Sequence, residues 1–158
     1  MTDDIRAPMS PTELPQQRIT AVVDLPCRPE GFEPVVDYGL AAGGIAPKKR
    51  PTKMAFLGGA EWAWSPMHNR IDAYYLHRGR RNWILYSRDL DPDDPIFTWR
   101  TVAYAPRRGI DERTAAIHLM IAWWGFEANE GLDEFHWLTH EGFLSTAEWR
   151  AIERMVWG

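Results

Sequence analysis

The sequence has a single cysteine, only three lysines and none of the short motifs that identify common catalytic sites. One cysteine excludes an internal disulfide framework, and Cys27 lies in a proline-rich stretch that is poorly suited to hold a nucleophile against a base. The phosphate-binding loop, the dinucleotide-binding glycine pattern, the hydrolase nucleophile elbow and the zinc-protease motif are all missing. We therefore predict no cofactor and expect a binding protein rather than an enzyme.

Long apolar runs are also missing. No stretch approaches the roughly 18 apolar residues that a membrane helix needs, and the N-terminus lacks the basic and apolar parts of a signal peptide. A single cysteine fits a reducing compartment. We therefore expect a cytoplasmic protein with no membrane partner. The net charge of −4 argues neither for nor against a polyanionic partner.

Aromatic residues are scarce at the start of the chain and abundant after it. Residues 1–52 hold eight of the twelve prolines and none of the nine tryptophans, so this part is unlikely to build a core of its own. We predict an N-terminal extension and linker over 1–52 and a single α+β domain over 53–158. Within the extension, Ile19–Leu25 and Phe32–Tyr38 are expected to lie extended on the domain or on a partner.

Residues 70–104 contain three runs rich in aromatic and β-branched side chains, which favour strands. The first turn, His77–Arg81, contains Gly79, and the second, Asp89–Pro95, is acidic and proline-rich. This order predicts an antiparallel meander. Gly58–Gly59 is typical of a tight turn, so a further hairpin is expected before the meander, which gives four or five strands in all.

Helical patterns follow the meander. Asp111 is a suitable N-cap for a helix whose stretch Ala115–Phe126 is almost wholly apolar and therefore predicted to be buried. Leu132–Glu141 is expected to form a short second helix, and Ser145–Glu148 is a capping box that begins a last one. The predicted fold is α+β: a four- to five-stranded antiparallel meander, followed by two or three C-terminal helices packed on one face.

Arginines are predicted to converge at one end of the sheet. Alternate turns of a meander fall at the same end, so the first turn lies beside the exit of the third strand. The residues concerned are Arg78, Arg80, Arg81, Arg107 and Arg108. Residues 53–110 hold nine basic against six acidic side chains, whereas 111–158 hold three against nine. The five arginines are thus candidates for binding a partner or a phosphate.

A metal site is a weaker hypothesis. Asp133, His136 and His140 share one face of the expected short helix, and two imidazoles with a carboxylate suit a divalent metal. The alternative is an ordinary polar helix face. His118, within the apolar helix, is a catalytic candidate or a buried histidine with a polar partner.

Three functions remain open from the sequence. The favoured one is a non-enzymatic adaptor or inhibitor-type module that engages a protein partner through its N-terminal extension and charged surfaces. The second is a nucleic-acid-binding protein that uses the arginine-rich end of the sheet. The third is a metal-dependent enzyme that uses the Asp133, His136 and His140 face. Oligomeric state is not readable from the sequence.

Overall fold

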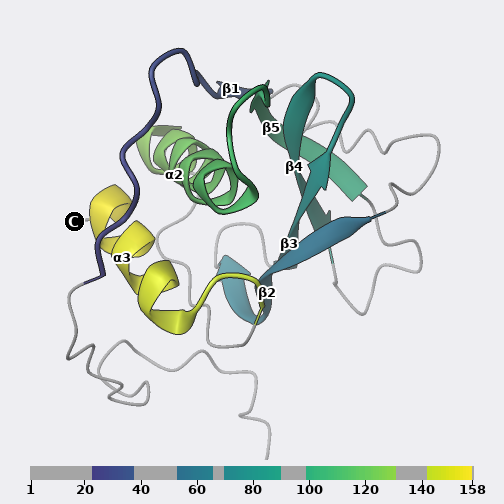
Figure 1. The fold of residues 1–158 in the computed structure, drawn as a ribbon. Coiled ribbons are helices and arrows are strands. Elements are labelled where there is room, and N and C mark those ends of the chain that lie inside the picture. The colour runs from purple at the N-terminus through teal and green to yellow at the C-terminus, as the bar shows by residue number, and fades with distance from the viewer. Residues whose placement is uncertain (1–22, 38–52, 66–69, 90–98, 131–141, 158) are drawn as a thin grey trace, which may run out of the picture.

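A computed structural model describes residues 23–37, 53–65, 70–89, 99–130 and 142–157 (Figure 1). Within these ranges, five antiparallel strands form one sheet, and two helices lie on the same side of it. In sheet order the strands are β1 (Val35–Val36), β5 (Trp99–Pro106), β4 (Asn82–Asp89), β3 (Arg70–Arg78) and β2 (Met54–Ser65). The helices are α2 (Glu112–Glu130) and α3 (Thr146–Trp157). This arrangement confirms the predicted fold class.

The pleat of the strands separates two faces of the sheet. Leu76 pairs with Leu85 and both are buried beneath the helices, so we call this side the inner face. Their neighbours His77 and Ile84 also pair, but they point to the opposite side because successive strand residues alternate. We call that side the outer face. The main hydrophobic cluster of the described residues lies on the inner face, and on the outer face Ala73 and Tyr86 are buried as well.

Both helices begin with the caps predicted from the sequence. The Thr114 amide donates a hydrogen bond to Asp111 Oδ1 at 2.8 Å, which caps α2. At α3 the Glu148 amide donates to Ser145 Oγ at 3.2 Å, and the Ser145 amide donates to Glu148 Oε1 at 2.7 Å. This reciprocal pair is a capping box. The expected short helix over Leu132–Glu141 lies outside the described residues.

The first of the two helices is buried along much of its length, as its apolar sequence predicts. Residues 115–120 of α2 are all buried, and α3 adds Trp149 and Ile152 to the same core. An ion pair between Arg113 of α2 and the buried Glu148 of α3 joins the starts of the two helices. No helix in the described part of the chain has the length and apolar character needed to cross a membrane.

The expected hairpin at Gly58–Gly59 is wrong. These glycines lie inside one strand, β2, which pairs with β3 before and after an irregular stretch, with register shifts at Phe56/Gly58 and at Gly59/Trp64. Gly58 has a φ of 138°, and a Cβ there would lie 2.6 Å from Nε1 of Trp149. That indole donates a hydrogen bond to the Leu57 carbonyl at 3.1 Å. The glycine therefore permits a close helix contact rather than a reversal of the chain.

Residues 23–37 of the expected extension lie on the domain. Val35 and Val36 pair with β5 at the sheet edge, and the Phe32 side chain is 1% exposed within the core. The imidazole of His118 in α2 donates from Nε2 to the Pro26 carbonyl at 2.6 Å. The structure thus places the described part of Phe32–Tyr38 against the sheet and the core, one of the two outcomes that the sequence allowed.

Candidate functional site

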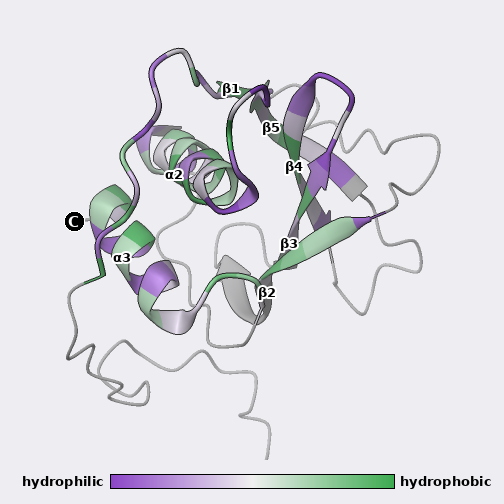
Figure 2. Cartoon of the chain, viewed as in Figure 1, coloured by the Kyte–Doolittle hydropathy of each residue, from purple (hydrophilic) through white to green (hydrophobic). Residues whose placement is uncertain are grey.

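All five predicted arginines line one open hollow of about 1370 Å³ at the hairpin end of the sheet. Figure 2 shows that the hairpin between β3 and β4 is strongly hydrophilic, in contrast to the apolar stretches of the strands below it. The hollow, which we call the basic hollow, is lined by Lys53, His77, Arg78, Arg80, Arg81, Trp83, Arg107, Arg108, Gly109, Ile110, Asp111 and Glu112. The convergence predicted from alternating turns is therefore what the structure shows.

Backbone hydrogen bonds hold the two arginine-bearing segments together. The Gly79 amide donates to the Asn82 carbonyl at 2.8 Å and closes the turn between β3 and β4. The Arg107 amide donates to the Arg81 carbonyl at 3.0 Å, which joins this turn to the loop after β5. A Cβ at position 79 would lie 2.9 Å from the Asn82 carbonyl oxygen, so glycine suits this tight turn.

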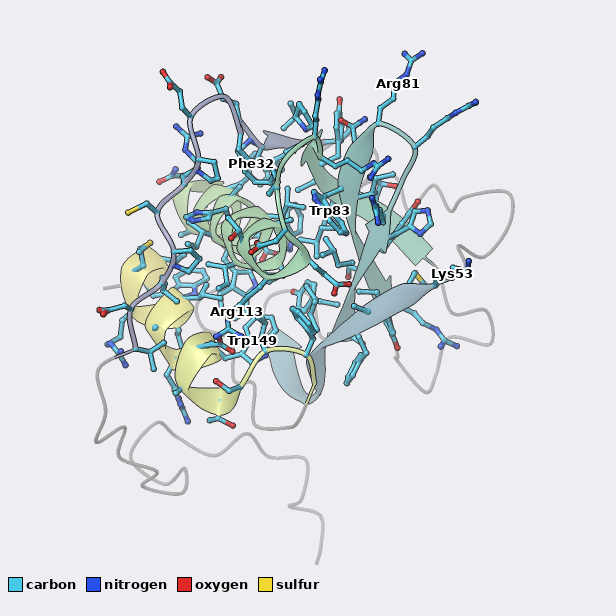
Figure 3. All side chains as sticks on the ribbon, viewed as in Figure 1. Phe32, Lys53, Arg81, Trp83, Arg113 and Trp149 are labelled. Carbon is cyan, nitrogen blue, oxygen red and sulfur yellow. The ribbon has the colours of Figure 1, made fainter. Side chains whose placement is uncertain are left out.

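Trp83 fixes the loop between β5 and α2. Its indole Nε1 donates to the Ile110 carbonyl at 3.0 Å, and the side chain is 6% exposed. Figure 3 shows Trp83 between the sheet and α2, with Arg81 projecting from the hairpin tip. The buried ring gives the hollow a rigid wall. It offers little surface on which a nucleobase could stack.

The cations of the hollow differ in how firmly they are placed. Arg107 Nε donates to the Arg80 carbonyl at 3.2 Å, which orients that guanidinium. The other lining cations are exposed to solvent, namely Lys53, Arg78, Arg80, Arg81 and Arg108. Exposed guanidinium groups keep most of their donors available to a carboxylate or a phosphate, and both anions suit the planar guanidinium.

Two carboxylates, Asp111 and Glu112, accompany the six cations. Hydrogen bonds from the side chain and the amide of Thr114 lower the pKa of Asp111 below its ordinary value. Asp111 is therefore ionised at neutral pH and engaged in capping α2. The lining as a whole retains an excess of positive charge. Such a field attracts anions over about 8 Å at physiological salt.

The other candidates from the sequence do not join this hollow. Asp133, His136 and His140 lie outside the described residues, so the metal hypothesis remains a prediction. Within the described ranges, no three His, Cys, Asp or Glu side chains are grouped so that they could hold a metal ion. His118 is 8% exposed and hydrogen-bonded to the Pro26 carbonyl. This fits the interpretation of His118 as a buried histidine with a polar partner.

Sequence reasoning missed Lys53 and His77 as lining residues. Lys53 immediately precedes β2, and β2 is antiparallel to β3, so the start of β2 lies beside the end of β3 and its arginine-bearing turn. The expected hairpin at Gly58–Gly59 concealed this signal, because it divided β2 into two shorter strands. For His77, the alternation of side chains along β3 indicated which face of the strand it is on. It did not indicate that this position borders the hollow, which also involves residues after β5.

Comparison with known proteins gives no further guide to the site. No family model, no curated protein and no solved structure matches this chain.

Proposed function

We propose that this chain is a non-enzymatic cytoplasmic binding protein, of adaptor or inhibitor type, that receives an acidic segment of a protein partner in the basic hollow. The observation that carries the proposal is the grouping of Arg78, Arg80, Arg81, Arg107 and Arg108 with Lys53 around one open hollow. The single, exposed Cys27 is compatible with a reducing compartment.

Carboxylate recognition follows from the side chains available. A guanidinium forms paired hydrogen bonds with a carboxylate, and exposed cations accelerate encounter with an anionic partner more than they strengthen the final complex. Arg107 is held in place through its bond to the Arg80 carbonyl, so it is better ordered for such a contact than a side chain without one. The more exposed arginines around it supply long-range attraction.

The described part of the N-terminal extension has a structural role that competes with partner binding. Phe32 is in the core, and Val35–Val36 form the edge strand. Release of this segment to a partner would expose Phe32 and break the pairing with β5. We therefore assign partner binding to the charged surface rather than to residues 23–37.

Nucleic acid is the second candidate, because the same six cations suit phosphate groups. Two observations make it the weaker one. The whole chain is acidic, with a net charge of −4, and the aromatic ring in the hollow, Trp83, is buried. A nucleic acid would therefore be limited to backbone contacts at this site, without base stacking.

Binding of a fluorescein-labelled, glutamate-rich peptide of about 12 residues tests the proposal by fluorescence anisotropy with the full chain. Arg80→Glu should weaken binding by about tenfold, because it replaces an attractive charge with a repulsive one. Arg154→Glu is the matched control, since Arg154 is exposed on α3 and does not line the hollow. Its effect should stay below about twofold.

Equal losses in the two variants would contradict the proposal, since they would report net charge alone. Tighter binding of a single-stranded or duplex oligonucleotide of similar length, with the same dependence on Arg80, would favour nucleic acid instead. Binding should also weaken as salt rises from about 50 to about 200 mM, because exposed charges are screened.

A further inference from the structure

The cations of the basic hollow form three groups along one end of the sheet. One group follows β5, one lies at the end of β3 and on the turn to β4, and one precedes β2. In this order they are Arg107 and Arg108, then Arg78, Arg80 and Arg81, and lastly Lys53. The strands lie in the order β5, β4, β3 and β2, so the three groups make a row with the hairpin group in the middle.

The row spans three strand spacings. The pairs of residues at this end of the sheet are Asn82 with Pro106, Arg78 with Trp83 and Met54 with His77. Neighbouring strands are about 4.8 Å apart, so the backbone at the start of β2 is about 14 Å from the exit of β5. Figure 3 shows Lys53 at the start of β2 and Arg81 at the hairpin tip, well apart from each other.

Lys53, at one end of the row, has an unusual backbone conformation. Its φ is 55°, and within the described ranges it is the one non-glycine residue with a positive φ. This left-handed conformation is disfavoured for a residue that has a Cβ, and glycine adopts it at lower cost. Residues held in such conformations cluster at binding and catalytic sites. The exposed Lys53 side chain is therefore a candidate contact for the partner.

We propose that the acidic segment of the protein partner lies extended along this row, with acidic side chains at alternate positions i, i+2 and i+4. This inference rests on the proposed function and specifies the partner further. An extended chain advances about 3.3 Å per residue, and its alternate side chains point to the same side. Positions i and i+4 are thus about 13 Å apart, which matches the length of the row.

Each acidic side chain then meets one group of cations. One outer carboxylate lies against Arg107 and Arg108, the middle one lies against the arginines of the hairpin, and the other outer one lies against Lys53. Arg107 is already oriented by its bond to the Arg80 carbonyl, so its guanidinium is prepared for paired hydrogen bonds with a carboxylate.

A helical segment fits the row less well for energetic reasons. It would need acidic side chains at i, i+4 and i+8 to reach both ends, because a helix advances about 1.5 Å per residue. Like charges at i and i+4 destabilise a helix, and isolated helices shorter than about 12 residues are marginal in water. A short acidic segment is therefore better suited to bind in the extended form.

Three fluorescein-labelled peptides of equal length and equal charge test the inference with the full chain. Each has three glutamates among serines, placed at alternate positions, consecutively, or at i, i+4 and i+8. Fluorescence anisotropy is measured at about 50 mM salt, where exposed charges are weakly screened. The alternating peptide should bind at least about fivefold more tightly than either of the others, because it alone reaches all three groups in the extended form.

Double-mutant cycles locate the two ends of the bound segment. Lys53→Gln and Arg108→Gln each remove one cation from one end of the row, and each should weaken binding of the alternating peptide by about threefold. Replacing the glutamate at one end of the peptide with glutamine should abolish the effect of Lys53→Gln only. The same replacement at the other end should abolish the effect of Arg108→Gln only. Arg154→Gln is the matched control and should leave the affinity unchanged, because Arg154 does not line the hollow.

Lys53→Gly separates binding from folding. It removes the charge and also relieves the left-handed backbone, so binding should weaken as it does in Lys53→Gln, while the midpoint temperature of unfolding stays the same or rises. A clear fall in the midpoint would mean that the fold requires Lys53, and would overturn its assignment as a partner contact.

Equal affinity of the alternating and consecutive peptides, or terminal glutamates that couple equally to Lys53 and Arg108, would overturn this inference while leaving the proposed function in place. Tightest binding of the peptide with i, i+4 and i+8 spacing would overturn it in favour of a helical segment. A failure of all three peptides to bind, or binding that Arg80→Glu does not weaken, would instead overturn the proposed function.

Discussion

The two faces of the sheet have similar sequences but different surroundings. In β4, Ile84 and Leu85 are adjacent aliphatic residues of equal size, yet Leu85 is 0% exposed under the helices and Ile84 is half-buried on the outer face. In β3, the neighbouring rings of Tyr74 and Tyr75 are divided in the same way. Side-chain alternation therefore identifies two faces. Which one forms the core depends on where the helices pack.

The largest effect is expected when the two neighbours in β4, Leu85 and Ile84, are each replaced by alanine. Leu85→Ala should lower the free energy of unfolding by about 2–5 kcal/mol, because it removes contacts and leaves a cavity in a close-packed core. Ile84→Ala should cost about 1 kcal/mol or less, since water already reaches that side chain. Urea unfolding followed by circular dichroism measures both. Equal costs would mean that the outer face is as fully packed as the inner one.

A second test disturbs the contact between the inner face and α3. Gly58→Ala should destabilise the protein by about 1–3 kcal/mol, because Gly58 has a φ of 138° and a Cβ would meet the Trp149 indole. Gly125→Ala is a matched control within α2, where an added Cβ has no neighbour within 4 Å. There alanine should stabilise by up to about 1 kcal/mol, as it does in other helices.

Thermal unfolding of the two glycine variants gives the comparison directly. If Gly58→Ala leaves the midpoint temperature of unfolding unchanged, α3 does not need the close approach of Trp149 to β2 in order to pack on the inner face.

The smallest expected effect concerns the cap of α2, the helix that covers much of the inner face. The folded-state pKa of Asp111 is lowered, so its contribution to stability is present above the ordinary carboxyl pKa and is lost as pH falls through the lower, folded value. Asp111→Asn keeps a capping side chain but removes this titration. The stability difference between the unmodified chain and Asp111→Asn should therefore shrink from about pH 5 to about pH 3.

Urea unfolding at several pH values measures this trend, and a difference that grows on acidification would contradict it. Asp111→Ala, which removes the cap itself, should cost about 1 kcal/mol at neutral pH.

The sequence was sufficient for features that depend on local patterns. The caps at Asp111 and Ser145 follow from side chains that bond nearby amides, and the structure confirms both. The convergence of the arginines follows from the alternation of turns in a meander, which is a property of connectivity alone. What these arginines bind remains a prediction. Their positive charge indicates that the ligand is an anion, but it does not distinguish the carboxylates of a protein from the phosphates of a nucleic acid.

Features that depend on distant contacts were not readable. Gly58–Gly59 resembles a turn in its local sequence, but its actual role is set by Trp149, which is far along the chain. In the same way, the local sequence left open whether Phe32–Tyr38 lies on the domain or on a partner, and the structure buries the Phe32 ring against elements that follow much later in the chain. The composition of a segment indicates whether it can form a core by itself. It does not indicate which contacts a distant segment makes with it in the folded chain.

The pairing of β1 with β5 has a consequence for how the chain reaches its native state. Neighbouring strands in the meander are joined by short or moderate connections, but Val35 meets Tyr104 only after nearly the whole meander has been traversed. Closing such a long loop is entropically costly until the rest of the sheet exists, so β1 should add late in folding. Synthesis makes β1 before the other four described strands, so β1 must wait for β5 to emerge before the two can pair.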